Sequence, residues 1–128
     1  MKKKSAWEKL KCGKQPHIVP EYQGQPMLVS SPEEVESVVA QIPPGHTMTL
    51  TQLRQELAHR HGVEHTCPMS TAIFVNIVAR AHAEREEETG QTGVPWWRVL
   101  RADGSLNEKF PGGAREQARR LAEEGIVL

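Results

Sequence analysis

The stretch from Thr92 to Arg101, TGVPWWRVLR, constrains the fold more than any other part of the chain. Two adjacent tryptophans follow a proline, and an alternating run then leads into Ala102-Asp103-Gly104-Ser105. Asp-Gly between two short extended runs is typical of a β-hairpin. Arg98 and Arg101 lie on or beside it, so the sequence predicts a basic hairpin, or wing, in this region.

Four helices are predicted around this hairpin. The first begins at the capping box Ser31-Pro-Glu-Glu34 and ends before Pro43-Pro44-Gly45. The second begins at the capping box of Thr49 and Gln52 and stops at Gly62. The third runs from residue 68 or 70 to about 88, and the fourth follows Pro111-Gly112-Gly113.

The order helix, helix, helix, hairpin, helix predicts a mainly α fold with a small β-hairpin, the winged helix-turn-helix. A Gly-containing turn joins helices two and three, which makes the third the groove-reading helix. Phe74 and Val75 on it could form a hydrophobic wedge between bases, but they favour core or partner contact. We expect residues 31–128 to form this domain. Residues 1–30 are predicted to be a basic extension that is partly wrapped or mobile. Residues 5–11 of it could form one or two helical turns, and the glycines and prolines from Gly13 to Pro26 prevent regular structure after them.

Charge and composition narrow the classes of function. The 128 residues contain 16 Lys and Arg against 16 Asp and Glu, which argues against indiscriminate nucleic-acid binding. The apolar runs are too short for a membrane span, and none follows the lysines at positions 2–4 as in an export signal. Two cysteines do not make a disulfide framework. We therefore expect a cytoplasmic, monomeric protein that does not act at a membrane.

Five segments in order carry a resemblance to a known family: Ile42–Gly45, Met48–Gln52, Val94–Val99, Gly112–Gly113 and Leu121–Gly125. Over residues 35–127 the chain resembles the DNA-binding domain of the alkylguanine-DNA alkyltransferases. It is more similar to the alkyltransferase-like proteins, which carry Trp in place of the reactive Cys. The resemblance implies a DNA-repair protein that binds double-stranded DNA with its third helix in the minor groove and recruits another repair protein.

The resemblance also assigns individual positions. Trp96 stands where the enzyme has its methyl-accepting Cys, and Trp97 where it has the His that helps activate that Cys. Arg98 matches the Arg that follows. Leu50 falls where the family usually has a Tyr that crowds the phosphate of the flipped nucleotide. Thr71 falls on the Arg that fills the hole left by the flipped base.

Alkyl transfer to protein needs an activated thiolate, and an indole is not such a nucleophile. We therefore predict non-enzymatic binding of DNA that contains alkylated guanine, with nucleotide flipping and lesion sensing. The alternative is a protein-interaction or regulatory module that has kept the fold and lost DNA binding. The zero net charge and the departures at Leu50 and Thr71 favour that alternative. A third alternative is a transferase that uses Cys67.

Two groups of candidate site residues follow. The first would form a lesion pocket in which an aromatic wall stacks on an extruded base, although core packing under the hairpin is the alternative; it consists of Val94, Pro95, Trp96 and Trp97. The second would contact DNA, and it consists of Thr49, Leu50, Thr71, Asn76, Arg98 and Arg101. Further basic residues would either contact phosphates or pair with glutamates on a solvated surface; these are Lys109, Arg115, Arg119 and Arg120.

A cluster of potential metal ligands lies at the end of helix two and in the turn before helix three. The spacing of His59, His61, His65 and Cys67 fits none of the common structural zinc patterns, so no metal and no cofactor is predicted. The acidic run at residues 84–88 is read as the solvated end of helix three.

Overall fold

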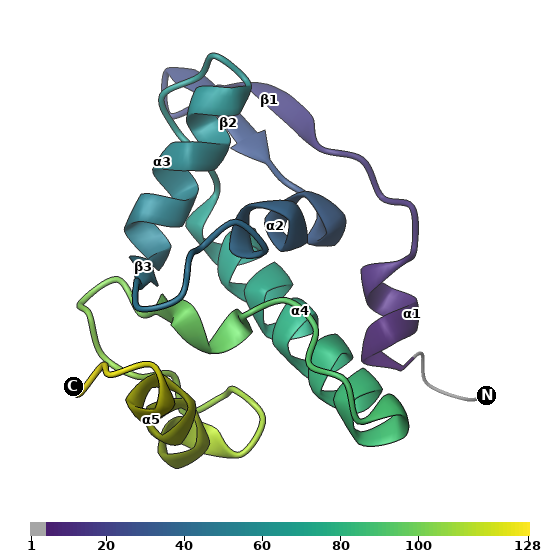
Figure 1. Cartoon of the computed structure of the whole chain (residues 1–128). Helices are drawn as coiled ribbons and strands as arrows, with labels where there is room; N and C mark the ends of the chain where they lie inside the picture. The colour runs from purple at the N-terminus through teal and green to yellow at the C-terminus, as the bar shows by residue number, and fades with distance from the viewer. Residues whose placement is uncertain (1–4) are drawn as a thin grey trace.

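Five α-helices and two small pairs of strands make up the described part of the chain, residues 5–128 of a computed structural model (Figure 1). Lys2, Lys3 and Lys4, which the sequence assigns to the basic extension, lie outside the described residues. The helices are α1 (Ala6–Leu10), α2 (Pro32–Val39), α3 (Leu50–Arg60), α4 (Pro68–Thr89) and α5 (Gly113–Glu123), with one 3₁₀ turn, η1 (Trp96–Arg98). The strands are β1 (His17–Tyr22), β2 (Gln25–Val29), β3 (Met48–Thr49) and β4 (Val99–Leu100).

Helix α4 is the longest element, and α1, α2, α3 and η1 all pack against it (Figure 1). It begins with Pro68. Proline is tolerated at this position because the N–H of the first helical residue would have no partner within the helix. It ends at Gly90, which adopts the left-handed conformation (φ 73°) that glycine tolerates best. The predicted bounds of helix three are therefore confirmed, and so is the mainly helical fold.

The starts of α2 and α3 follow their local sequence signals. The Ser31 hydroxyl accepts from the Glu34 N–H at 3.2 Å. At α3 both halves of the capping box form: the Thr49 hydroxyl accepts from the Gln52 N–H at 3.2 Å, and the Gln52 side chain accepts from the Thr49 N–H at 2.9 Å. Both predicted starts are confirmed, because each depends on residues three positions apart.

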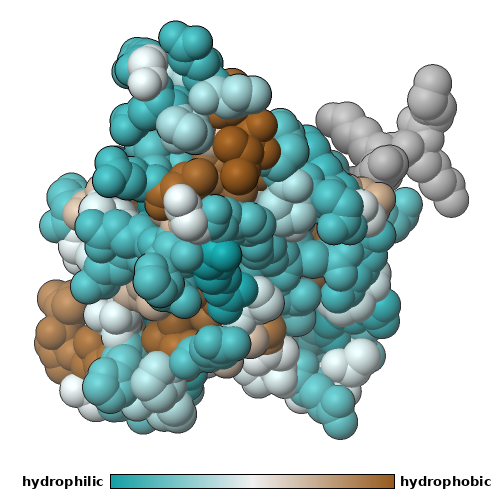
Figure 2. All heavy atoms as spheres, turned by 90° about the horizontal axis from the view of Figure 1, so that it is seen from above, coloured by the Kyte–Doolittle hydropathy of each residue, from teal (hydrophilic) through white to brown (hydrophobic). Residues whose placement is uncertain are grey.

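The buried apolar residues form one contiguous core that joins every helix. Leu10 and Leu28 belong to it, so α1 and β2 contribute to the same core as the long helix. Phe74 and Val75 are also buried in it, as the core interpretation of these two residues expected. The division at residue 30 into an extension and a domain stays a prediction. Seen from above, the surface is mostly hydrophilic with separate apolar patches (Figure 2).

Residues 17–29 form an antiparallel hairpin, so the prediction of irregular structure from Gly13 on is wrong, whereas the helical turns expected at residues 5–11 are present as α1. Strands β1 and β2 pair with Tyr22 opposite Gln25, and Gln23 and Gly24 both have positive φ, as in the favoured two-residue hairpin turn. The prolines are accommodated because β1 is an edge strand and its register shifts between Val19 and Tyr22, around Pro20. Strand β2 also bonds the loop before α4: the Leu28 N–H donates to the His65 carbonyl at 2.8 Å.

The predicted hairpin at residues 97–105 is not found in the described residues. Strand β4 pairs instead with β3, in parallel, with Met48 opposite Val99 and Thr49 opposite Leu100. The segment after it does turn, since the Gly104 N–H donates to the Arg101 carbonyl at 2.9 Å, but no strand follows. The wing is therefore not confirmed: the Arg101 N–H does donate to the Ser105 carbonyl across the turn at 2.9 Å, but the strand that pairs with β4 lies about 50 positions earlier in the chain.

Within residues 5–128, no helix combines the length and the apolar composition needed to cross a bilayer.

Candidate nucleic-acid interface

One face of α4 is turned to solvent along most of the helix. Met69, Ile73 and Arg80 are exposed on it, and Asn76 between them is half-buried. Their spacing of three or four residues places them on one side of the helix. This side is the part of α4 that a large ligand can reach.

Three hollows follow this face, and each shares lining residues with the next. The Leu50 hollow (≈ 310 Å³) is lined by Leu50, Ala72, Asn76, Arg101, Asn107, Glu108 and Lys109. The Arg80 hollow (≈ 400 Å³) is lined by Arg80, Ala83, Glu84, Glu87, Lys109 and Pro111. The Trp96 hollow (≈ 360 Å³) is lined by Ala83, Glu86, Glu87, Trp96, Pro111, Gly112, Arg115, Glu116 and Arg120.

Lys109 joins the first hollow to the second, and Ala83, Glu87 and Pro111 join the second to the third. A groove therefore runs along α4 from Leu50 to Trp96, with residues 107–112 as its opposite wall.

The groove is lined by cations that form no ion pair with the described residues, and the carboxylates of Glu84, Glu87 and Glu108 line it as well. Among residues 5–128, the groove-lining Arg80, Arg101, Lys109 and Arg115 form no ion pair. Arg80, Arg101, Lys109 and Arg115 are all exposed. Unpaired cations that border a groove are the electrostatic requirement for phosphate contact.

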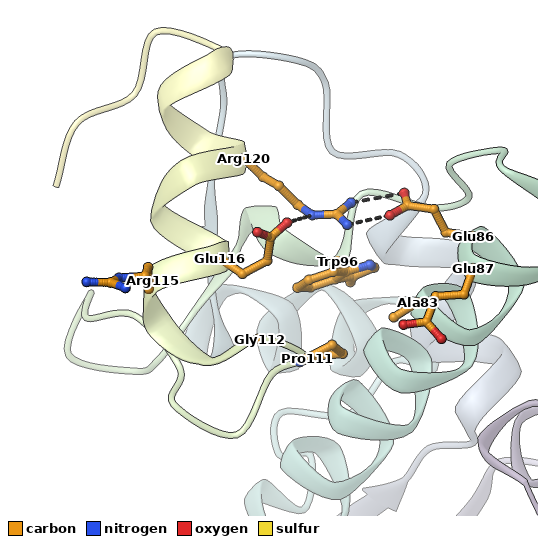
Figure 3. A pocket seen from close by; sticks show the side chains of 9 residues that line it. All are labelled: Ala83, Glu86, Glu87, Trp96, Pro111, Gly112, Arg115, Glu116 and Arg120. Carbon is orange, nitrogen blue, oxygen red and sulfur yellow. Dashed lines mark hydrogen bonds and ion pairs between the residues drawn. The ribbon is translucent and has the colours of Figure 1, made fainter.

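At the far end of the groove Trp96 forms the floor of its hollow (Figure 3). Its side chain is only 2% exposed, and its ring meets Trp97 and Phe110 edge to face at centroid distances of 5.6 and 5.5 Å. The 3₁₀ turn η1 produces this arrangement, because a turn directs both tryptophans inward where a strand would have directed them to opposite faces. Trp97 borders a separate hollow (≈ 440 Å³), which Glu86 and Arg120 also line.

Arg120 covers the indole of Trp96. Its guanidinium carbon lies 4.9 Å from the Trp96 ring centroid and 5.1 Å from that of Trp97. Glu86 accepts from it at 2.5 and 3.1 Å, and Glu116 accepts at 2.7 Å (Figure 3). The Arg120 hydrogen bond lowers the pKa of Glu86. Hydrogen bonds from Arg119 foremost, and from Arg120, lower the pKa of Glu116 to about 2, so both carboxyl groups are ionised at neutral pH.

Gln117 fixes the backbone of η1 and β4. Its amide nitrogen donates to the carbonyls of Trp97 and Val99 at 3.0 and 2.8 Å, and its amide oxygen accepts from the Asn107 N–H at 2.7 Å. The side chain is fully buried. It thus connects the floor of the Trp96 hollow to the wall of the groove.

Arg98 makes structural contacts and does not line the groove. Its guanidinium binds the Glu124 carboxylate at 2.8 to 3.1 Å and donates to the Ile42 carbonyl at 2.6 Å. Glu124 also accepts from the Trp97 indole N–H at 2.8 Å. The Arg98 guanidinium holds the pKa of Glu124 at about 2. These partners enclose the Arg98 side chain, which lines none of the three hollows of the groove, and its phosphate contact stays a prediction.

The predicted site residues separate into groups. Leu50, Asn76 and Arg101 meet in the Leu50 hollow, while Asn76 also accepts from the Asn107 amide at 3.3 Å. Thr49 is next to them, but its hydroxyl caps α3. Thr71 is fully buried and its hydroxyl donates to the Cys67 carbonyl at 2.7 Å, so the structure does not bring it to the groove and its DNA contact stays a prediction.

The predicted lesion-pocket residues are not all in one place either. Trp96 and Trp97 are both buried and border different hollows. Val94 and Pro95 are half-buried and line neither of these hollows. Core packing and a pocket wall were the two interpretations of the tryptophans. Each tryptophan packs in the core and each also borders a hollow.

The three arginines of α5 differ in whether an ion pair holds them. Arg119 pairs with Glu116 and Glu123, and Arg120 pairs with Glu86 and Glu116. Arg115 alone of the three on α5 is unpaired among the described residues, which fits the phosphate reading for that residue.

The histidines and the cysteine between α3 and α4 have separate partners. His61 contacts the Glu34 carboxylate at 2.6 Å, and the His65 ring stacks on Tyr22 at 6.4 Å. Within residues 5–128, no three potential ligands are arranged to hold a metal ion. Burial alone would raise the pKa of the Cys67 thiol, but hydrogen bonds from Ser70 and Met69 at the start of α4 outweigh it and lower that pKa.

Sequence reasoning missed the cluster of Glu86, Glu116 and Arg120. Glu116 and Arg120 are four residues apart on one helix, which is a recognisable pair in the sequence. Glu86 belonged to the run that was read as a solvated helix end, and its partner lies 34 positions away. Glu84 from the same run also has a partner, because it accepts from the Ala6 N–H at 3.2 Å.

A helical domain with unpaired cations along a groove beside its longest helix fits a DNA-binding domain. The chain belongs to the family described as 6-O-methylguanine DNA methyltransferase, DNA binding domain, whose model matches residues 30–126. Membership associates the chain with DNA binding in alkylation repair. Neither the curated proteins nor the solved structures contain a match.

Proposed function

We propose that this protein binds double-stranded DNA that contains alkylated guanine and does not remove the alkyl group. DNA would lie along the groove beside α4, and an extruded base would enter the Trp96 hollow. The observation that carries the proposal is Trp96 itself: the residue at the family's methyl-acceptor position is an indole that forms the floor of a hollow. At ≈ 360 Å³ this hollow lies within the range of small-molecule sites, roughly 300–1,000 Å³.

The position of Cys67 supports binding without transfer. It precedes the first residue of α4, whereas Ala83, Glu86 and Glu87 of the same helix line the Trp96 hollow. Sixteen residues of helix separate Cys67 from Ala83, which corresponds to about 24 Å at the helical rise per residue. A base held in the Trp96 hollow is therefore out of reach of this thiol.

The exposed apolar residues of α4 favour a minor-groove contact. Phe74 and Val75 are buried, but Ile73 is exposed beside Asn76, and Met69 is 74% exposed. Apolar side chains of this kind act as wedges between base steps in minor-groove binders. Ile73 would then partly replace the missing arginine finger. Recruitment of a repair-protein partner remains what the resemblance implies.

The test is fluorescence-anisotropy titration of labelled duplexes with guanine, O6-methylguanine or N7-methylguanine at one position, at two salt concentrations. Wild type should bind an alkylated duplex more tightly than the unmodified one, with affinity that falls as salt rises. Trp96→Ala should reduce that preference by about tenfold, the value of one stacking contact. Trp96→Phe is the second variant if the first fails to fold.

Trp7→Phe is the matched control, since Trp7 packs edge to face on His82 at 5.7 Å and lines none of the three hollows. Intact-mass measurement after incubation with the methylated duplexes should find no added methyl group; an added methyl group would make the protein a transferase. Absence of binding to every duplex at low salt would favour the protein-interaction module instead.

A further inference from the structure

The Trp96 hollow already holds a planar cation. The Arg120 guanidinium lies over the Trp96 ring, 4.9 Å from its centroid, and its edge donates to Glu86 and Glu116. Its side chain is mostly buried between them (Figure 3). The hollow is thus built as an aromatic floor with carboxylates around the edge, an arrangement that stabilises a flat, positively charged group.

A base that stacks on Trp96 must displace this guanidinium. Glu86 would then lose its only ion-pair partner among residues 5–128, while Glu116 would keep Arg119. An unpaired, partly buried carboxylate is costly, so the incoming base must offer positive charge or N–H donors in exchange. A neutral base that turned hydrogen-bond acceptors toward Glu86 would leave this carboxylate without a partner.

The two common alkylation products of guanine differ in this respect. Alkylation at N7 gives the ring a positive charge and keeps the N1–H and N2 amino donors. Alkylation at O6 leaves the ring neutral and turns N1 into an acceptor. A carboxylate accepts readily from the first edge and is repelled by the lone pair at N1 of the second.

We propose that the Trp96 hollow is selective for a cationic alkylated purine, with N7-alkylguanine as its representative, over the neutral O6-alkylguanine. This inference rests on the proposed function, because it names the class of lesion that the same hollow takes. Trp96 supplies the face for the cationic ring, and Glu86 and Glu116 accept from its donor edge. Unmodified guanine has the donors and lacks the charge.

The neighbouring hollow provides space for the displaced arginine. Arg120 and Glu86 line both the Trp96 hollow and the ≈ 440 Å³ hollow beside Trp97. The second hollow is also lined by Glu123 and Glu124, which already pair with Arg119 and Arg98, so a guanidinium that swings into it finds space there without a carboxylate of its own. The exchange therefore needs a rotation of one side chain and no movement of a helix.

The experiment compares three duplexes that carry guanine, O6-methylguanine or N7-methylguanine, the last with a 2′-fluoro sugar that blocks depurination. Wild type should bind the N7-methyl duplex about tenfold or more tightly than either other duplex, as expected for one cation–π contact together with charge-assisted hydrogen bonds. Glu86→Gln and Glu116→Gln should each reduce the ratio of N7-methyl to unmodified affinity severalfold. The ratio is the readout because removal of any carboxylate near DNA strengthens binding to all three.

Glu88→Gln is the matched control, since this exposed carboxylate is on the same helix as Glu86 and lines neither the Trp96 hollow nor the hollow beside Trp97. Arg120→Met should tighten binding of the N7-methyl duplex, because it removes the internal competitor; a phosphate contact by Arg120 would give the opposite sign. Thermal melting checks that each variant is folded.

The outcomes separate the two proposals. Preference for the O6-methyl duplex, or equal affinity for both methylated duplexes, would overturn the cationic selectivity and leave the proposed function intact. Equal affinity for all three duplexes would overturn both. An N7-methyl preference that persists unchanged in Glu86→Gln and Glu116→Gln would remove the carboxylates from the explanation.

Discussion

Among the single residues, Gln117 holds the backbone of Trp97 and Val99 against the groove wall. It is fully buried and satisfies two carbonyls of the η1–β4 segment and one backbone N–H of the groove wall. Buried polar groups are stabilising only while each partner is present. The apolar pattern of α5 gives no sign of this role, since a glutamine on a charged helix is usually exposed.

Replacement of Gln117 by Met keeps the length of the side chain and removes all three hydrogen bonds. We expect Gln117→Met to lower the free energy of unfolding by about 2–4 kcal/mol, because buried carbonyls and an N–H are left without partners. Urea unfolding followed by tryptophan fluorescence measures this. Gln55→Met, on the exposed side of α3, is the control and should change stability by less than about 0.5 kcal/mol. Equal stability of the two variants would contradict the structural role.

Among the helices and strands, those set by neighbouring residues could be predicted from the sequence, and those set by distant residues could not. The starts of α2 and α3 could be predicted because a cap and its partner are three residues apart. The pairing of β4 with β3 could not, because the strands are two residues long and about 50 positions apart. Asp103-Gly104 does mark a turn, but a turn does not specify which strand, if any, follows it.

The same distinction applies to the candidate site. The resemblance assigned Trp96 to the lesion pocket, where the structure shows it lining a hollow, and the structure brings Leu50, Asn76 and Arg101 together in the groove. The burial of Thr71 and the enclosure of Arg98 could not be read from the sequence, since each depends on the orientation of a helix or on a carboxylate 26 positions away.

The capping box of α3 gives a second prediction. Thr49→Ala removes the hydroxyl that accepts from the Gln52 N–H, and we expect a loss of about 1 kcal/mol in the free energy of unfolding. Thermal unfolding followed by circular dichroism measures the loss. Thr51→Ala, two residues into the same helix and exposed, should leave the midpoint almost unchanged. A loss of DNA affinity in folded Thr49→Ala, beyond that of Thr51→Ala, would give Thr49 a binding role as well.

At the scale of the whole molecule, ion pairs tie α5 to segments far away in the chain. Glu124 at its end binds Arg98 of η1 and accepts from the Gly45 N–H of the loop after α2 at 3.0 Å. Arg120 at its middle binds Glu86 of α4. Because these contacts hold the walls of the Trp96 hollow in place, the stability of the molecule and the shape of the hollow should respond to acid together.

The pKa of Glu124 is lowered from an ordinary 4.5 to about 2 by the Arg98 guanidinium, so its contribution to stability has a definite pH window. A carboxyl with a depressed pKa stabilises the folded state fully above its unfolded pKa and loses that contribution as pH falls through its folded pKa. Wild type should therefore lose stability between about pH 5 and pH 2, measured by urea unfolding at a series of pH values. Glu124→Gln should already be less stable at pH 7, by about 3 kcal/mol, because Arg98 is left enclosed without its counter-ion. The free energy of unfolding of Glu124→Gln should then fall less steeply across the acid window than that of wild type.

The control is Glu123→Gln, which removes the exposed carboxylate next in sequence and should follow the wild-type curve. Parallel acid curves for wild type and Glu124→Gln would show that the Arg98–Glu124 pair does not hold α5 in place.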